Sequence, residues 1–370
     1  MSETPKILLT NASLIYAGGE YYVLELAKEL TNRNIDVTVC CHTQNLLYKK
    51  CKIEGIKLFG LDFPEKGKLL KQIKILKDHI KEFDYDIIHT NTNYDRTAGA
   101  FAAKLAGKKH ITNVHSFQSI ANNITQKYRN RSATDLFITD GHCVKELLIN
   151  KDKIPAEKIK VLQLGIDPEI TKKEVSLRKK VRDEFNIKDN EVLIGNTGRL
   201  EEFKGQEYLI RAIAILRNKD NVKVIIVGDG RLEMMLKDLS EELKISDRII
   251  FAGFRDDLQA LYSAFDIYAH PSIEGGGETF PFSVLYSLAA GIPAIVTKVG
   301  DVAEMIIENE TGFVVNEKDV ISLSNKLELF ISDESMRVEF GKRALVNLKD
   351  KFTITKMTDN VVRFYEEVLD

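Results

Sequence analysis

Residues 270–293 read His270-Pro-Ser-Ile-Glu274-Gly-Gly-Gly-Glu278-Thr-Phe-Pro281-Phe-Ser-Val-Leu-Tyr286-Ser-Leu-Ala-Ala-Gly291-Ile-Pro293. An apolar strand is predicted over 265–269, and an apolar run at helical spacing follows the glycines. Gly291 fits the C-terminus of that helix, and Pro293 prevents the helix from continuing. We therefore expect the turn to hold Glu278 and several backbone N–H groups at the start of a helix. Open α/β sheets bind ligands at this end of their strands, and helix N-termini favour anions.

The same alternation of short apolar runs and amphipathic segments fills the rest of the chain. Strands are predicted over 6–11, 36–41, 55–60, 86–91, 110–115 and 135–139, and again over 192–197, 222–227, 249–251, 265–269, 294–297 and 312–315. Helical patterns lie between them, for example over 22–30 and 97–105. This pattern predicts an α/β protein with two Rossmann-like, doubly wound parallel-sheet domains that face a cleft. A polar stretch within 166–190 marks the boundary. We expect domains over 1–168 and 169–352, and a final helix over 353–370 that crosses back to the first domain.

Length and composition narrow the class of protein. The chain has 370 residues, enough for two domains with their own cores, and its formal net charge of -2 gives no general attraction to nucleic acid. No apolar leader precedes the first strand, and no apolar run is long enough to span a bilayer. The cysteines show neither metal-binding spacing nor a dense disulfide framework, so we expect reduced thiols in a cytoplasm and a buried strand at Cys40 and Cys41.

A second motif, Gly198-Arg199-Leu-Glu-Glu-Phe203-Lys204-Gly205, follows the first strand of the second half. It places two positive charges over the carboxyl edge of the sheet. That suits a diphosphate, because Arg binds two oxygens in a fork and Lys acts as a point charge. The alternative is a solvated loop with ordinary surface charges. Because the Glu278 turn belongs to the same half, we favour phosphate binding.

Several other positions have both a structural and a functional interpretation. Gly228-Asp-Gly230 is typical of a tight turn, and it also leaves room for a nucleotide. Gly18 and Gly19, between the first strand and the first helix, allow a ligand close to backbone amides, although the dinucleotide fingerprint is missing.

His115 ends a strand, and we leave its structural and ligand-binding roles open. His89 and His142 are expected to be structural, and Asp84-Tyr-Asp86 is expected to be a loop at the wrong end of the sheet for a metal site.

Together these residues resemble the retaining glycosyltransferases of family 4 (glycosyl transferases group 1), which have the GT-B fold. The resemblance runs along nearly the whole chain. It includes Gly18-Gly19, Gly165-Ile-Asp167, Gly198-Arg199-Leu200 with Lys204-Gly205, Gly228-Asp-Gly230, Phe251-Ala-Gly253-Phe254, Asp266, Pro271-Ser272 and Glu278 through Pro293.

The resemblance implies a role for each matching residue. Arg199 and Lys204 would hold the donor diphosphate, Glu278 would contact the donor sugar, and His115 would face the transferred sugar. Other positions would line the donor site: the glycines Gly18, Gly19 and Gly198, backbone near Phe254, backbone amides at Thr279 and Phe280, and the side chain of Tyr286.

This sequence departs from the family pattern at one position that matters. Family members usually carry a second glutamate eight positions after the first, often bonded to the nucleotide ribose, and here that position is Tyr286. A phenol can donate one hydrogen bond to a ribose hydroxyl but cannot accept two as a carboxylate can. Pro281 also stands where many members have glycine, which removes a backbone donor.

The expected function is transfer of a sugar from a UDP- or GDP-linked donor to a hydroxyl of a growing glycan or lipid-linked acceptor, with retention at the anomeric carbon. Such an enzyme would serve lipopolysaccharide or capsule synthesis and would need no cofactor or metal. Two alternatives stay open: a non-catalytic subunit of the same fold, which Tyr286 favours, and a nucleotide-sugar epimerase.

A predicted helix in the first half carries a dense row of lysines: Lys66, Lys68, Lys71, Lys74, Lys77 and Lys81. Its apolar stripe is expected to consist of Leu69, Ile73, Leu76 and Ile80. Either the stripe docks on the sheet while the lysines face water, or the docked helix also presents its lysines to anionic lipid on the inner face of the cell membrane.

Overall fold

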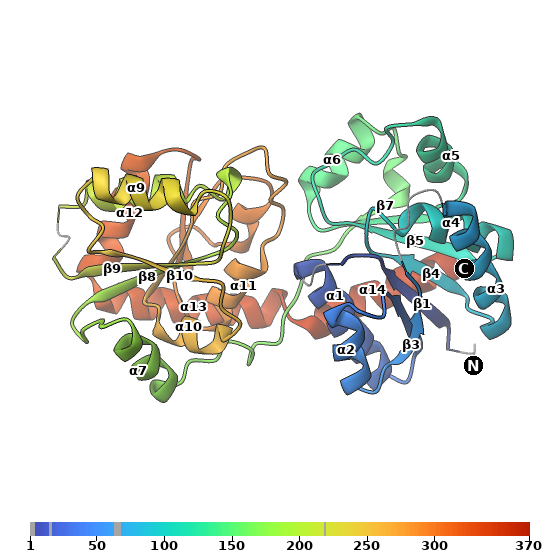
Figure 1. The fold of residues 1–370 in the computed structure, drawn as a ribbon, viewed down its shortest axis with the longest axis horizontal. Coiled ribbons are helices and arrows are strands. Elements are labelled where there is room, and N and C mark those ends of the chain that lie inside the picture. Colours follow the sequence, from blue (N-terminus) through green and yellow to red (C-terminus); the bar gives the residue numbers. More distant parts are fainter. Residues whose placement is uncertain (1–3, 15–16, 63–67, 218–219) are drawn as a thin grey trace. The chain divides into compact units, whose positions relative to one another are not determined.

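The computed structural model describes residues 4–14, 17–62, 68–217 and 220–370. The chain divides into two compact units (Figure 1). Unit 1 comprises Met1–Leu164 and Ile354–Asp370, and unit 2 comprises Gly165–Thr353.

Unit 1 contains a parallel sheet of seven strands in the order β3-β2-β1-β4-β5-β6-β7. The strands are β1 (Lys6–Asn11), β2 (Asp36–Cys41), β3 (Lys57–Gly60), β4 (Ile87–Thr90), β5 (Lys109–Val114), β6 (Leu136–Thr139) and β7 (Ile159–Val161). Cys40 and Cys41 are buried in β2, as expected. The order of the strands reverses between β1 and β4, and a doubly wound sheet binds its ligand at such a switch point.

The helices of unit 1 are α1 (Gly18–Asn32), α2 (Leu46–Ile53), α3 (Leu69–Phe83), α4 (Arg96–Ala106), α5 (Ile124–Ser132), α6 (His142–Asn150), the short η1 (Ala156–Lys158) and α14 (Ile354–Leu369). Buried side chains of α3 and α4 pack with β1, β2 and β4 in one core. The C-terminal helix α14 packs beside α1 in this unit. Its Tyr365 hydroxyl lies 2.8 Å from the buried His89 Nδ1, so His89 has a structural partner.

Unit 2 contains a six-stranded sheet in the order β10-β9-β8-β11-β12-β13, also parallel. Its strands are β8 (Val192–Thr197), β9 (Val222–Val227), β10 (Ile249–Gly253), β11 (Ile267–His270), β12 (Ala294–Thr297) and β13 (Gly312–Val315). The switch point lies between β8 and β11. The two sequence motifs that follow β8 and β11 therefore meet at the ligand-binding position of the sheet.

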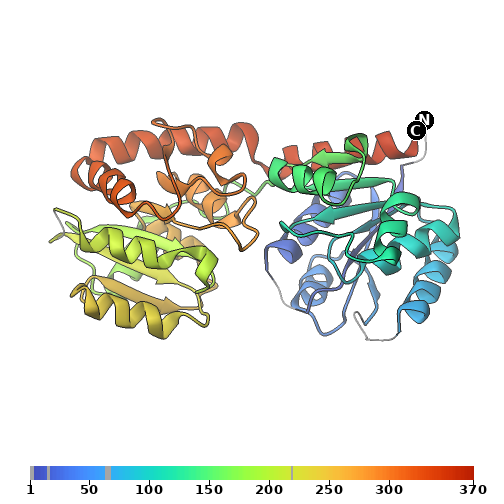
Figure 2. The ribbon, with the colours of Figure 1, turned by 90° about the horizontal axis from the view of Figure 1, so that it is seen from above.

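The helices of unit 2 are α7 (Val175–Glu184), η2 (Glu202–Lys204), α8 (Gln206–Ala214), α9 (Glu233–Glu242), α10 (Leu258–Ala264), α11 (Phe282–Ala289), η3 (Val302–Met305), α12 (Val320–Ser332) and α13 (Glu334–Lys351). Helices α8, α9 and α12 share one core with the sheet, and Figure 2 shows α8 and α9 side by side. Figure 1 shows α7 and α10 on the opposite side of this sheet.

Three details differ from the sequence-based expectations. The polar stretch 166–190 contains α7, which packs on α10 and whose buried Arg182 pairs with Asp266 at 3.3 Å. Strand β11 begins at Ile267, because Phe265 ends α10 and its ring fills the space beside Gly195. Helix α11 begins only at Phe282, after Pro281, so Glu278 lies in the turn and not on the helix itself.

Candidate active site

The turn after β8 presents two cations close to one aromatic ring. The Arg199 guanidinium lies 5.4 Å and the Lys204 ammonium 5.5 Å from the centre of the Phe203 ring. Arg199 is exposed, whereas the Lys204 side chain is only 15% exposed. Gly198 has a φ of +154°, a conformation that side chains disfavour. This turn thus holds one accessible and one buried positive charge at the carboxyl edge of the sheet.

The turn after β11 brings a carboxylate onto the buried cation. Glu278 Oε2 lies 2.5 Å from Lys204 Nζ and accepts a hydrogen bond from Ser272 Oγ at 3.0 Å. His270 Nε2 lies 3.3 Å from the same oxygen and 3.1 Å from Ser272 Oγ. The Glu278 side chain is 9% exposed, so this is a buried ion pair with two polar neighbours.

The charge state of this cluster follows from its geometry. Burial alone would raise the pKa of Glu278, but the Lys204 cation and the bond to His270 hold that pKa well below its usual range. Burial lowers the pKa of His270 more than Glu278 raises it. The cluster is therefore a charged Glu278–Lys204 pair beside a neutral imidazole at neutral pH.

Of the two glutamates in this turn, only Glu278 enters the cluster. Glu274 is exposed, and its backbone N–H donates to Glu317 at 2.7 Å. Of the glycines between the two glutamates, Gly276 is needed for close packing, since a Cβ there would lie 1.8 Å from the Phe203 ring. The turns after β8 and β11 thus fit against each other through a residue without a side chain.

The turn after β9 is also built onto the Arg199 turn. A Cβ on Gly228 would lie 2.0 Å from the Gly198 carbonyl oxygen, and one on Gly230 would lie 2.5 Å from the Leu200 carbonyl oxygen. Gly228-Asp-Gly230 therefore has a packing role, as the structural interpretation expected. That packing fixes the path of the backbone that carries Arg199.

The remaining residues predicted for unit 2 lie in different environments. Phe254 is 75% exposed just after β10, where its ring is available to a ligand. Thr279 and Phe280 are buried, and the Phe280 ring packs on Phe352 at 5.4 Å, so only their backbone remains for binding. Tyr286 lies on α11, half-buried, with its ring 5.8 Å from that of Tyr262.

In unit 1, the predicted residues gather beside the switch point of the sheet. Gly18 and Gly19 begin α1 immediately after the β1 turn, and a Cβ on Gly19 would lie 4.0 Å from the His115 ring. The carboxylate of Glu20 accepts hydrogen bonds from the Asn11 side chain at 3.1 Å and from the Ala17 N–H at 2.8 Å, which fixes this turn.

His115 lies directly after β5 and is held by an acid that the sequence had not indicated. Its Nδ1 lies 2.8 Å from the Asp140 carboxylate, which directly follows β6. Its Nε2 is buried and finds no hydrogen-bond partner among the described residues. Burial would lower the pKa of His115, but the Asp140 carboxylate raises it above its ordinary value. The ring therefore has one nitrogen fixed and the other buried without a partner among the described residues.

We predict that replacing Asp140 by asparagine lowers the pKa of His115, because burial then acts without the opposing charge. Since the folded-state pKa is raised in the native protein, the stability from protonated His115 is present below its unfolded pKa of about 6.5 and is lost as pH rises through the folded pKa. NMR titration of the His115 ring, assigned through His115→Gln, measures this directly. An unchanged His115 pKa in Asp140→Asn would contradict the pairing.

The site contains residues that sequence reasoning missed. Asp140, His270, Ser272 and Phe203 act through contacts between segments that are far apart in the chain or lack a distinctive spacing. The position of Asp140, directly after a predicted strand, was the available signal. Within the described ranges, no group of three or more His, Cys, Asp or Glu side chains could hold a metal ion. Asp84 pairs with Lys108 at 2.7 Å, as suits a surface loop.

Comparison with known proteins points to one family for both units. The model of Glycosyltransferase Family 4 matches residues 16–170, and the model of Glycosyl transferases group 1 matches residues 178–346. The chain is 28% identical over 302 residues to an uncharacterized glycosyltransferase, MJ1607, of Methanocaldococcus jannaschii, covering 77% of each chain. It is 24% identical over 402 residues to the UDP-Gal:alpha-D-GlcNAc-diphosphoundecaprenol alpha-1,3-galactosyltransferase of Escherichia coli, covering 98% of each.

Solved structures share the fold. A glycosyltransferase from Rickettsia africae matches with a TM-score of 0.90 at 22% identity, covering 100% of this chain and 99% of that one. Anabaena Alr3699/HepE in complex with UDP matches with a TM-score of 0.86 at 22% identity, covering 98% and 100%. The expected class of two doubly wound parallel sheets, the GT-B fold, is confirmed by these matches and by the observed strand orders.

Proposed function

Because the chain belongs to the family 4 glycosyltransferases, we propose that it transfers a sugar from a nucleotide donor to a hydroxyl of a growing glycan, with retention at the anomeric carbon. The observation that carries this proposal is the arrangement of Arg199, Lys204 and Glu278 at the switch point of the unit 2 sheet. One exposed cation, one buried cation and one fixed carboxylate suit a diphosphate with a sugar attached.

In the proposed reaction, the acceptor oxygen bonds to the anomeric carbon while the bond from that carbon to the donor phosphate oxygen breaks. Arg199 and Lys204 stabilise the charge that grows on the leaving diphosphate, an electrostatic contribution from groups already in place. The acceptor proton passes to a leaving phosphate oxygen. Glu278 contacts the transferred sugar, and in unit 1 the His115 Nε2 has no hydrogen-bond partner among the described residues.

Relatives support the proposed classes of donor and acceptor. The Anabaena protein binds UDP and UDP-glucose, which supports a UDP-linked donor over a GDP-linked one. The E. coli relative acts on a sugar carried on diphosphoundecaprenol, which supports a lipid-linked acceptor and a role in surface polysaccharide synthesis.

Incubation of the purified protein with UDP- and GDP-sugars tests the proposal. A donor at 100 times its dissociation constant should stabilise the protein by about 2.7 kcal/mol, which thermal shift detects. Slow release of free sugar and nucleoside diphosphate supports the transferase. An altered sugar still attached to its nucleotide would identify an epimerase, and failure to bind any donor would identify a non-catalytic subunit.

Tyr286 gives a further prediction about this site. If its hydroxyl holds the ribose, Tyr286→Phe should weaken binding of the nucleoside diphosphate and of the full donor alike, by about threefold to tenfold for one hydrogen bond. Calorimetric titration of both ligands measures the effect. Unchanged affinity for both would show that the ring only packs, as its contact with Tyr262 allows.

We also propose that helix α3 contacts an anionic membrane. Ile73, Leu76 and Ile80 are buried, but Leu69 is 37% exposed and Leu70 is 82% exposed, so the first turn leaves apolar side chains uncovered. Lys71, Lys74 and Lys81 are exposed, Lys77 is half-buried beside Asp78, and Lys66 lies outside the described residues. No helix in the described part of the chain is long and apolar enough to cross a membrane.

We predict that the protein co-sediments with anionic vesicles at low salt and is released at high salt, because each lysine near such a surface contributes about 1 kcal/mol that salt screens. Replacing the α3 lysines at 71, 74, 77 and 81 by glutamine should abolish sedimentation and leave donor binding intact. A matched control replaces the exposed unit 2 lysines Lys180, Lys188, Lys244 and Lys349. Wild-type protein that stays in the supernatant at low salt would favour a soluble acceptor.

A further inference from the structure

Unit 1 contains a pocket between α5 and the connection from α6 to β7, with a volume of about 440 Å³ and several charged side chains in its lining. Its lining includes residues that precede the amino end of β7, such as Pro155 and Lys158. His115 and Asp140, in contrast, follow the carboxyl ends of β5 and β6. The pocket is therefore separate from the part of unit 1 assigned to sugar transfer.

The charges around this pocket are unbalanced. Its cations are Lys127, Arg131, Lys151, Lys153 and Lys158, and its one acid is Asp152. Both carboxylate oxygens of Asp152 are already occupied, one by the Ser119 hydroxyl and the other by the Ile120 N–H at 2.7 Å. Lys158 donates to the Thr134 carbonyl at 3.2 Å. The other four cations form no ion pair with any carboxylate in the described ranges.

A fifth cation without an ion pair, Arg129, contacts a residue that lines the pocket. Asn130 lines the pocket, and its Oδ1 accepts two hydrogen bonds from the Arg129 guanidinium at 2.9 and 2.7 Å. Arg129 is 2% exposed, and its other acceptors are the neutral Thr97 hydroxyl and Ile120 carbonyl. Burial lowers the pKa of Arg129 to about 9, and the Asp152 charge only partly offsets this. An anion in the pocket would supply the charge that this arginine lacks.

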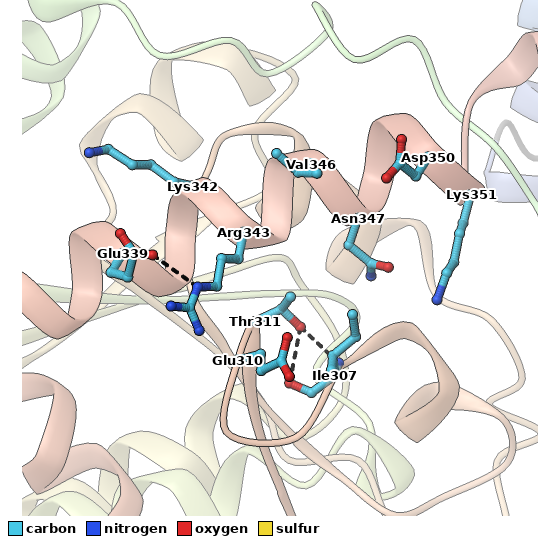
Figure 3. A pocket seen from close by; sticks show the side chains of 10 residues that line it. All are labelled: Ile307, Glu310, Thr311, Glu339, Lys342, Arg343, Val346, Asn347, Asp350 and Lys351. Atoms are coloured by element: carbon cyan, nitrogen blue, oxygen red, sulfur yellow. Dashed lines mark hydrogen bonds and ion pairs between the residues drawn. The ribbon is translucent and has the colours of Figure 1, made fainter.

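A pocket of unit 2 offers a comparison. It has a volume of about 380 Å³ and lies between α13 and the segment before β13 (Figure 3). There the three cations face three acids, and Arg343 Nε pairs with Glu339 at 2.9 Å. The excess of positive charge in the unit 1 pocket is thus absent from this unit 2 pocket.

We propose that the pocket formed by Lys127, Arg131, Lys151 and Lys153 is an anion site that binds a phosphate-bearing ligand, separate from the donor site. The fork of Arg131 can hold two phosphate oxygens, and the lysines add point charges. The volume exceeds what a single phosphate needs, so a diphosphate or a phosphorylated headgroup fits better. Unit 1 as a whole carries more Lys and Arg than Asp and Glu, whereas unit 2 shows the reverse.

Calorimetric titration with inorganic pyrophosphate at low salt tests the site. The background protein carries Arg199→Ala and Lys204→Ala, so that the turn after β8 does not contribute to pyrophosphate binding. Replacing Lys127 and Lys153 by glutamine, both exposed and hence tolerant of change, should weaken binding at least about tenfold. The matched control replaces the exposed Lys49 and Lys52 of α2 and should bind as the background does. Equal affinity in the pocket and control variants, or no binding by the background, would overturn the proposal.

A second arm identifies the source of the phosphate. Vesicles of phosphatidylglycerol are offered to protein that keeps its α3 lysines, with phosphatidylcholine vesicles as the neutral reference. If the Lys127 and Lys153 substitutions also weaken sedimentation with the phosphatidylglycerol vesicles, the ligand is a lipid headgroup. If they abolish only pyrophosphate binding, the ligand is a soluble phosphate. If they change neither, the pocket is not an anion site.

Discussion

Replacing Lys204 by alanine should lower the rate of sugar transfer at least about tenfold, and so should replacing Arg199, because each removes a charge-assisted bond worth about 1.5–3 kcal/mol. Their effects on stability should differ. Lys204→Ala leaves the buried Glu278 carboxylate without its cation, whereas Arg199 is exposed and no ion pair joins it to a described acid. Only Lys204→Ala should therefore destabilise unit 2 at neutral pH.

Steady-state kinetics and chemical unfolding measure the two effects separately. A suitable control is Arg211→Ala on α8, which removes an exposed cation paired with Glu207 away from the site. Near-normal turnover in both Arg199→Ala and Lys204→Ala would contradict the assignment of these two residues to diphosphate binding. Excess chelator should leave transferase activity unchanged. A complete loss of activity would refute a reaction in which Arg199 and Lys204 alone stabilise the leaving diphosphate.

Replacing Glu278 by glutamine should slow transfer roughly 10- to 100-fold, since a charge that contacts the sugar is lost while the shape is kept. Binding of the bare nucleoside diphosphate should be preserved or tightened, because Lys204 would no longer share its charge with a carboxylate at 2.5 Å. The measurement pairs turnover with calorimetry of UDP binding.

The neighbouring Glu274 supplies the matched control, since it is exposed and outside the buried cluster. Glu274→Gln should leave both turnover and UDP binding unchanged. Equal weakening of UDP and of the full donor in Glu278→Gln would argue against a role in contacting the sugar.

Much of the fold could be predicted because local patterns determine it. The buried strands β1, β2, β8, β9, β12 and β13 lie where the apolar runs placed them. The three-residue β7 was missed because Ile159–Val161 is too short to give a pattern. Helix α7 was taken for a linker, since it packs on α10 and pairs Arg182 with Asp266, contacts that only the folded chain reveals.

For the candidate site, individual residues could be predicted, but the contacts between them could not. Arg199, Lys204, Glu278 and His115 could be found from spacing and from the family resemblance. The sequence could not reveal that Lys204 pairs with Glu278 or that Asp140 orients His115. The members of these two pairs are 74 and 25 residues apart in the sequence. Pair contacts across strand ends depend on the order of strands in the sheet, which the sequence pattern alone leaves open.

The glycine contacts between the turns after β8 and β9 have a consequence for protein engineering. Since Gly228 leaves no room between its own backbone and the Gly198 carbonyl, the two turns cannot be redesigned independently. A library that varies Gly228 would displace Arg199 in every member and lose activity irrespective of the donor offered. Efforts to change donor preference should instead vary exposed positions such as Phe254, where a new side chain would not displace the backbone.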